Sequence, residues 1–136
     1  MATASSIKKL THIKPDGANQ VGVMRYEWTS HSTAGTVSNK LDNAGGHITK
    51  IVTNPDGTAA PTANYDITLV DADSLDVALG TLANRHTSTT EVVYPTVAGS
   101  AANNTDVRAS FAGKLTLTIA DAGNSKKGVI AIYYGV

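Results

Sequence analysis

Short segments in which apolar and polar residues alternate recur along the chain, with turn signals between them. The clearest are Tyr65 to Val70 and Gly113 to Ala120; in the second, Leu115, Leu117 and Ile119 alternate with Lys and Thr. A period of two residues places successive side chains on opposite faces of a β-strand. Each segment therefore predicts a strand with one buried face.

Other segments carry a similar signal. We expect further strands at Ser6 to Ile13, Val21 to Ser30, Thr36 to Leu41, Ile48 to Thr53, Glu91 to Val97 and Gly128 to Tyr134. In the second of these, Tyr26 and Trp28 share a face, which we expect to be buried. The last is apolar on both faces, which is typical of a central strand or an interface. We expect it to form a hairpin with the strand that precedes it.

Turn chemistry separates the strands. Pro-Asp-Gly occurs within Lys14 to Gly17 and again within Asn54 to Gly57, and Asp42 to Gly46 is a third expected turn. The Leu and Val spacing between Asp73 and Asn84 is compatible with one or two helical turns. By composition, Ala98 to Asp106 is a flexible loop.

These elements predict an all-β fold: an antiparallel β-sandwich, jelly-roll-like, of about eight strands with at most a short helix. A chain of 136 residues fits one domain. We expect residues 1–14 to be an N-terminal arm or first strand and residues 15–136 to be a single β-sandwich domain. The side chains expected in its core are Tyr26, Trp28, Ile67, Leu69, Leu115, Leu117 and Ile119.

Charge and composition narrow the possible partners. Eleven Lys and Arg balance eleven Asp and Glu, so no net field attracts nucleic acid or an anionic membrane, and neither is an expected partner. The chain has no Cys, which excludes disulfides and thiolate metal sites. No run approaches the roughly 18 apolar residues of a membrane helix, and the first ten residues lack an apolar signal-peptide core. We expect a soluble protein that is not exported by a signal peptide.

Motifs for catalysis are missing from the sequence. It has no Gly-x-Ser-x-Gly elbow and no glycine-rich phosphate loop. Glu27 and Glu91, the only glutamates, look like surface strand residues. We therefore expect no enzyme, no catalytic residue and no cofactor.

Three aspartates and four histidines are the candidate metal ligands in the sequence. Asp71, Asp73 and Asp76 are close in sequence but lack the other ligand positions of an EF-hand loop, which favours an Asp turn. The four histidines are far apart, without metal-ligand spacing, and are expected to be surface or turn residues. They are His12, His31, His47 and His86.

The two ends of the chain supply the candidate interface. Lysines near the N-terminus form a positive stripe, which is either a solvated strand edge or an arm that docks on an acidic protein surface. We expect such an arm to be mobile in the free protein. Two tyrosines near the C-terminus combine large area with a polar tip. The candidate interface residues are Lys8, Lys9, Lys14, Tyr133 and Tyr134.

Two stretches resemble small virion proteins of tailed bacteriophages. One is the ending, residues 113–124 and 128–134; the other runs from Tyr65 to Asp71 and on through residues 75–80 and 83–85. The likeness extends over roughly residues 20–136. Among such proteins the chain resembles the head-decoration or cement proteins. The resemblance implies a β-sandwich homo-oligomer, dimer or trimer, that binds the major capsid protein on the outer surface of the virion capsid and stabilises the shell.

Other functions remain open at this point. The chain is alternatively a tail or head–tail accessory virion protein. A carbohydrate- or receptor-binding β-sandwich module is a further alternative, although one Trp and one Phe are a thin supply for an aromatic platform. The last alternative is a hydrolase without a recognised motif.

Overall fold

The computed structural model describes residues 5–17, 20–98 and 106–135, and these form nine β-strands and no helix. The strands are β1 (Ser6–Ile13), β2 (Val21–Thr29), β3 (Val37–Pro55), β4 (Asp66–Val70), β5 (Glu91–Val93), β6 (Thr96–Ala98), β7 (Asp106–Arg108), β8 (Ser110–Ala120) and β9 (Lys127–Gly135).

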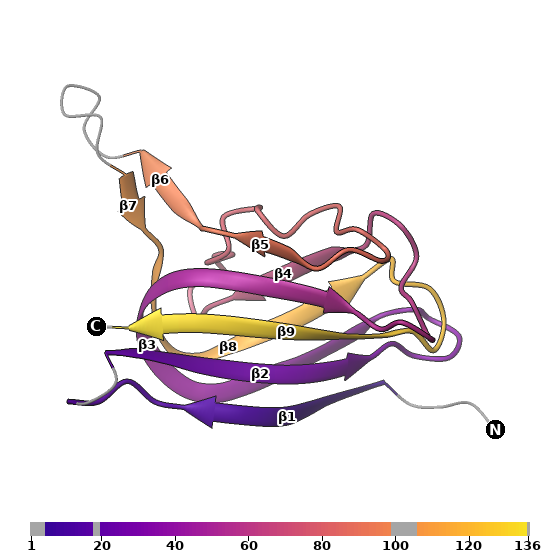
Figure 1. Ribbon diagram of the computed structural model, residues 1–136, viewed down its shortest axis with the longest axis horizontal. Helices are drawn as coiled ribbons and strands as arrows, with labels where there is room; N and C mark the ends of the chain where they lie inside the picture. Colours follow the sequence, from indigo (N-terminus) through magenta and orange to yellow (C-terminus); the bar gives the residue numbers. More distant parts are fainter. Residues whose placement is uncertain (1–4, 18–19, 99–105, 136) are drawn as a thin grey trace.

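Seven of the strands form one antiparallel sheet in the order β1-β2-β9-β3-β8-β4, with β5 paired to β3 (Figure 1). The sheet folds over its own core but does not close into a barrel. β6 and β7 form a separate two-stranded ribbon that projects from the body in Figure 1. The prediction of an all-β, antiparallel, sandwich-like fold is confirmed.

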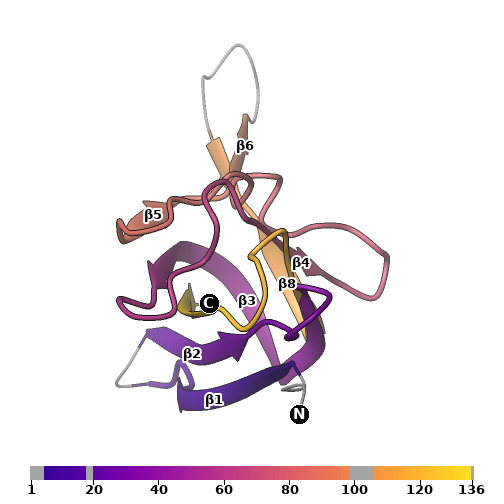
Figure 2. The same ribbon diagram turned by 90° about the vertical axis from the view of Figure 1, so that its right-hand side faces the viewer.

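Strand β3 belongs to both halves of the folded sheet. Its residues 37–47 pair with β8, whereas residues 47–55 pair with β9 and, over three residues, with β5. Figure 2 shows the strand curving between the two halves. The bend includes Gly46, whose φ of 142° favours glycine. The expected turn at Asp42 to Gly46 is therefore wrong: the glycines bend a continuous strand instead of reversing the chain.

The expected hairpin between the last two long strands is also wrong. β8 pairs with β3 and β4, whereas β9 lies between β2 and β3. The segment between them carries the chain from one half of the sheet to the other. The central position predicted for β9 from its two apolar faces is confirmed.

The core lies between the two halves and matches the residues expected from the alternating pattern. All seven of those side chains are at most 3% exposed. The Trp28 ring packs at 5.6 Å from Tyr65 and Phe111 packs at 5.6 Å, edge to face, against Tyr134. These rings extend an otherwise aliphatic core toward both ends of the strands.

The segment from Asp73 to Asn84 forms consecutive turns and no helix. Ser74 and Leu79 have positive φ values, which interrupt any helical run. The carboxylate of Asp76 accepts backbone N–H bonds from both sides, including that of Leu69 at 3.0 Å. An aspartate that satisfies several backbone donors stabilises a turn in place of the one or two helical turns that the spacing favoured.

The N-terminal segment is a strand of the sheet in the described part of the chain. β1 pairs with β2 along its length, so for residues 6–13 the expectation of a mobile arm is wrong, and the alternative of a first strand holds. The expected loop from Ala98 to Asp106 falls mainly on residues 99–105, outside the described residues, as do residues 1–4. In the described part of the chain, no helix has the length and apolar character needed to cross a membrane.

Candidate functional site

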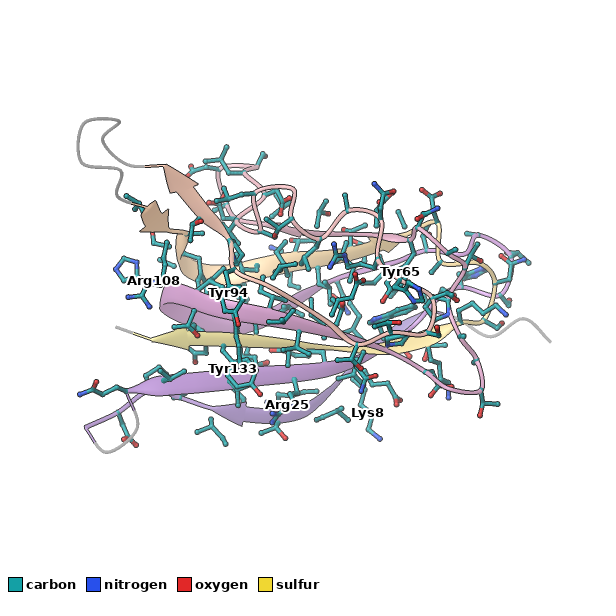
Figure 3. All side chains as sticks on the ribbon, turned by 45° about the horizontal axis from the view of Figure 1, so that its top comes forward. Lys8, Arg25, Tyr65, Tyr94, Arg108 and Tyr133 are labelled. Atoms are coloured by element: carbon teal, nitrogen blue, oxygen red, sulfur yellow. The ribbon has the colours of Figure 1, made fainter. Side chains whose placement is uncertain are left out.

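The outward face of the half built from β1, β2, β9, β3 and β5 carries two adjacent rows of mostly apolar side chains. Strand pairing aligns the first row as Ile13, Val23, Tyr133 and Lys50, and the second as Thr11, Arg25, Ala131, Val52 and Val92. Tyr94, directly after β5, adds a second ring, and Figure 3 shows both tyrosines on the side of the sheet toward the viewer. We call these residues the tyrosine face.

Part of this face is buried without belonging to the core. Val23 and Ala131 are 7% and 6% exposed, yet neither is in the core cluster, because they point away from it and are covered by neighbours on the face. Beside them, Tyr94 is 62% exposed and Val92 47%. The result is a contiguous apolar surface in the middle of a sheet, which in soluble proteins marks an interaction surface more often than a solvated one.

Two cations hold Tyr133 in place. Arg25 donates a 2.7 Å hydrogen bond from Nη2 to the phenol oxygen, and the Nζ of Lys50 lies 4.6 Å from the ring centroid. Neither cation forms an ion pair with a carboxylate among the described residues. Tyr133 is thus a preformed anchor flanked by two positive charges that no carboxylate of the described residues neutralises.

The outward face of the other half, formed by β4, β8 and the first part of β3, has a different chemistry. Its rows are Ser38, Thr118 and Thr68, and then Lys40, Thr116 and Val70. The hydroxyls of Ser38 and Thr118 are 2.9 Å apart and hydrogen-bonded. We call these residues the threonine face, and it has the composition of a sheet face in contact with water.

Side chains, not backbone, join β1 to the first part of β3 at the open side of the sheet. The described residues form no ladder between these two strands. Instead, Asp42 Oδ2 accepts hydrogen bonds from Lys9 Nζ at 3.1 Å and from His12 Nδ1 at 2.9 Å. The other ring nitrogen of His12 is 2.7 Å from the Tyr134 hydroxyl, and the Asp42 N–H donates to the Tyr26 hydroxyl at 3.1 Å. We call these five residues the seam.

Burial and charge fix the protonation of the seam. Burial raises the pKa of Asp42, but the hydrogen bonds and positive charges of Lys9 and His12 outweigh it, so the pKa lies below its ordinary value. Burial, followed by the Asp42 charge, raises the pKa of Tyr134. Burial likewise raises the pKa of Tyr26. At neutral pH the seam therefore contains a carboxylate and two protonated phenols.

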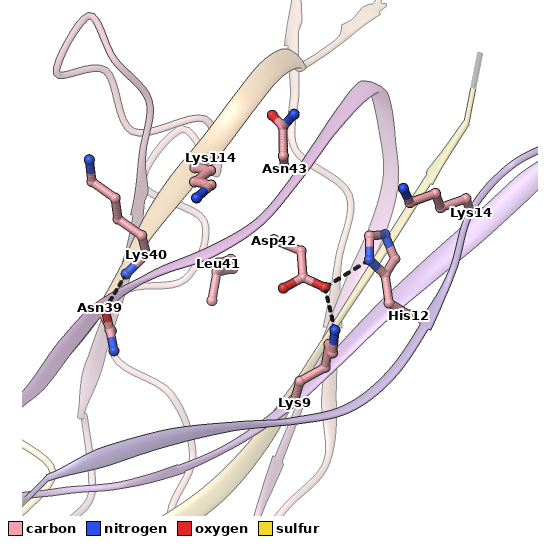
Figure 4. A pocket seen from close by; sticks show the side chains of 9 residues that line it. All are labelled: Lys9, His12, Lys14, Asn39, Lys40, Leu41, Asp42, Asn43 and Lys114. Carbon is pink, nitrogen blue, oxygen red and sulfur yellow. Dashed lines mark hydrogen bonds and ion pairs between the residues drawn. The ribbon is translucent and has the colours of Figure 1, made fainter.

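A hollow of about 710 Å³ lies over the seam (Figure 4). Side chains from three strands and the residue after β1 line it. They are Lys9, His12, Lys14, Asn39, Lys40, Leu41, Asp42, Asn43 and Lys114. Four of the nine are lysines, and Asp42 is the one carboxylate among them.

The structure divides the predicted lysine stripe between two surfaces. A bulge at Leu10, where the pairing of β1 with β2 skips a residue, changes which face the following side chains occupy. Lys8 points outward beside the tyrosine face, whereas Lys9, His12 and Lys14 line the hollow. A strict period of two separates Lys8 from Lys9 but would place His12 and Lys14 on the side of Lys8.

The two predicted C-terminal tyrosines also separate. Tyr133 is half-buried on the tyrosine face, as a surface anchor requires. Tyr134 is 2% exposed and packs in the core. It therefore offers no surface to a partner, contrary to its prediction as an interface residue. Neighbours on a strand point to opposite faces, so at most one of the pair reaches the outside.

No group of three or more His, Asp or Glu side chains lies close enough to hold a metal ion in the described part of the chain. Asp71 Oδ1 accepts the N–H groups of Asp73 and Leu75 and so organises a turn. His31 and His86 do the same with their Nδ1 atoms, each accepting N–H groups two and three residues further along.

Sequence reasoning missed Asp42, Lys50 and Tyr94. Asp42 was placed in a turn, and its partner His12 is 30 residues away, so no local pattern links them. Lys50 reaches the tyrosine face because the second part of β3 pairs with β9, and Tyr94 because β5 pairs with β3. For Arg25, another residue of the tyrosine face, the sequence did carry a signal. The alternation in β2 places its side chain on the face opposite Tyr26 and Trp28.

Comparisons with protein-family models, with curated proteins and with solved structures find no match to this chain.

Proposed function

We propose that the protein is a structural component of a tailed-bacteriophage virion that binds the outer surface of the assembled capsid and stabilises it. The proposal joins the sequence resemblance to head-decoration proteins with one structural observation. That observation is the tyrosine face, an apolar surface with a fixed aromatic anchor on a sheet whose other outward face is polar.

The side chains of the tyrosine face indicate the chemistry of the partner. Aromatic side chains and Arg are the residue types that contribute most to protein–protein binding, above all when they are held in place before binding. Arg25 and Lys50 flank Tyr133 without a carboxylate partner among the described residues. The proposed partner, the major capsid protein, should therefore present an apolar strip bordered by Asp or Glu.

Binding to an assembled lattice stabilises that lattice by mass action, because the ligand favours the state that it binds. A homo-oligomer, dimer or trimer, would engage neighbouring subunits at once and gain avidity without new kinds of contact. Stabilisation by mass action and gain of avidity are both available to a small domain of this kind.

The test uses heads assembled without this protein. Purified protein is mixed with such heads and with unassembled capsid subunits, and binding is measured by co-sedimentation. We expect binding to heads and not to subunits, together with release of DNA at a higher temperature. Tyr133→Ala should weaken binding, and Thr118→Ala, on the threonine face, is the matched control.

Electron microscopy of virions that carry labelled protein separates the alternatives. Label spread over the head surface supports the proposal. Label restricted to the tail or the head–tail junction would replace it with an accessory role. Failure to bind heads at all, with tight binding to a host-surface glycan, would replace it with a receptor-binding role.

A further inference from the structure

The hollow over the seam has an excess of positive charge, although the chain as a whole is neutral. Over the whole sequence eleven Lys and Arg balance eleven Asp and Glu, but the lining of the hollow has four lysines and one carboxylate. That carboxylate, Asp42, is already engaged by Lys9 and His12. The other three lysines, Lys14, Lys40 and Lys114, form no ion pair among the described residues.

The positions of these lysines concentrate the charge. Lys14 follows β1, Lys40 lies on β3 and Lys114 on β8, so lysines from three separate segments line one depression. Figure 4 shows Lys14 reaching in from one side and Lys114 lying on the opposite side. Like charges gathered around a concave surface repel one another and raise the local concentration of anions.

The floor of the hollow is rigid because the seam fixes it. The side chain of His12 is only 8% exposed and is held by hydrogen bonds at both ring nitrogens. A ligand that enters the hollow therefore meets a floor that is already ordered, and less free energy is lost in arranging it. The lysines of the walls are the adaptable part.

We propose that this hollow binds carboxylate groups of an acidic protein segment, with Lys14 and Lys114 as the main contacts. A hollow of about 710 Å³ is far larger than a single small anion needs, since a water molecule occupies about 30 Å³ of liquid. It fits several side chains of a peptide. The inference does not depend on the proposed role of the tyrosine face and concerns a different surface.

The lining favours a protein segment over nucleic acid or lipid. None of its side chains has an aromatic ring on which a base would stack, apart from the imidazole of His12, which the seam occupies. Leu41 is the one apolar side chain of the lining, so an acyl chain finds little surface.

The experiment measures binding of a hexaglutamate peptide to the full chain by titration at low ionic strength. Lys14→Gln/Lys114→Gln removes two exposed lysines of the hollow, and Lys8→Gln/Lys127→Gln removes two exposed lysines elsewhere. We expect the hollow variant to bind about tenfold more weakly and the control variant to change by about twofold or less. Both variants retain Lys9 and Asp42, so the seam and the fold should be intact, which circular dichroism verifies.

Three outcomes overturn the inference. Equal weakening in the two double variants would show that the peptide responds to overall charge and not to the hollow. Absence of measurable binding to the unaltered chain would remove the hollow as a carboxylate site. A single-stranded oligonucleotide of equal charge that binds more tightly than the peptide, with the same loss in Lys14→Gln/Lys114→Gln, would assign the hollow to nucleic acid. None of these results bears on head binding by the tyrosine face.

Discussion

The two outward faces of the folded sheet share one core and one strand, β3, yet they differ in almost every surface property. The threonine face presents hydroxyls and a lysine, and its hydroxyls bond to one another. The tyrosine face presents aliphatic and aromatic side chains, buries two of them outside the core and holds a phenol between two cations.

The threonine face shows the side-chain composition of a solvent-exposed sheet face in this protein, and the tyrosine face can be compared with it. Both faces lie on strands of one antiparallel sheet, so strand geometry alone does not account for the difference. Tyr94 and Val92 on the tyrosine face stay exposed, so they gain little from burial within the folded chain. The proposed partner would account for this exposed apolar surface, and the predictions below test that contrast.

The largest loss of stability is expected from a substitution in the core between the two halves of the sheet. Leu117 is fully buried on the inward side of β8, and its neighbour Thr118 lies on the threonine face. Leu117→Ala should lower the free energy of unfolding by about 2–5 kcal/mol, because it removes buried methyl groups and leaves a cavity. Thr118→Ala should change it by about 0.5 kcal/mol or less. Urea denaturation measures both, and similar values would mean that the faces are assigned incorrectly.

Binding should respond to the tyrosine face alone. Tyr133→Ala removes the anchor between Arg25 and Lys50 and should weaken binding to heads by about 2 kcal/mol, or roughly 30-fold. Thr116→Ala should leave binding unchanged. The comparison fails if both substitutions weaken co-sedimentation equally, because the two faces would then contribute alike.

The bend in β3 connects the two faces and depends on Gly46. A Cβ at this residue would meet the Gly135 carbonyl oxygen, and the φ of 142° is strained for any other residue. Gly46→Ala should therefore cost about 1–3 kcal/mol of stability. Gly57→Ala, at a glycine with open space around it and without a positive φ, is the control. An equal, small loss for both variants in thermal unfolding would show that the bend tolerates a side chain.

The smallest effect is expected at the seam and depends on pH. The pKa of Asp42 is lower in the folded chain than its ordinary value of 3.8, so its carboxylate stabilises the fold above about that pH. This contribution is lost as the pH falls through the folded pKa. Asp42→Asn should cost about 1 kcal/mol or less at pH 7, because it removes exposed and half-buried ion pairs.

The same substitution should also flatten the acid side of the stability curve. Unfolding free energies measured between neutral and acidic pH check this for the unaltered chain and for Asp42→Asn. A curve of identical steepness in both would show that Asp42 does not couple the seam to pH. Asp56, whose pKa is also lowered by hydrogen bonds from Ala59 and Thr58, remains in both proteins.

Local alternation was sufficient to predict the strands and the core, and long-range pairing was not. The period of two assigned Leu117 and Ile119 to the core because each residue's face follows from its neighbours. It did not predict that β8 and β9 belong to different halves, since the same alternation suits a hairpin and a crossover. Gly45 and Gly46 looked like a turn because glycine permits both a reversal and a bend.

The candidate surfaces were predicted less completely for a related reason. Tyr133 was identified, but its separation from Tyr134 depends on which face of β9 meets the core. The N-terminal lysines look like one stripe, but alternation separates Lys8 from Lys9, and the bulge at Leu10 brings Lys14 to the side of Lys9. Asp42 became part of the seam only through contacts across the open side of the sheet, which no window of sequence contains.

Radical footprinting of the protein, free and bound to heads, tests the central claim most directly. Tyr94 and Tyr133 report on the tyrosine face, and Leu75, which is 63% exposed in the turns after β4, reports on a surface outside it. The account predicts that oxidation of Tyr94 and Tyr133 falls sharply on heads while that of Leu75 is unchanged. Tyrosines as reactive on heads as in the free protein, with protection at Leu75 instead, would contradict it.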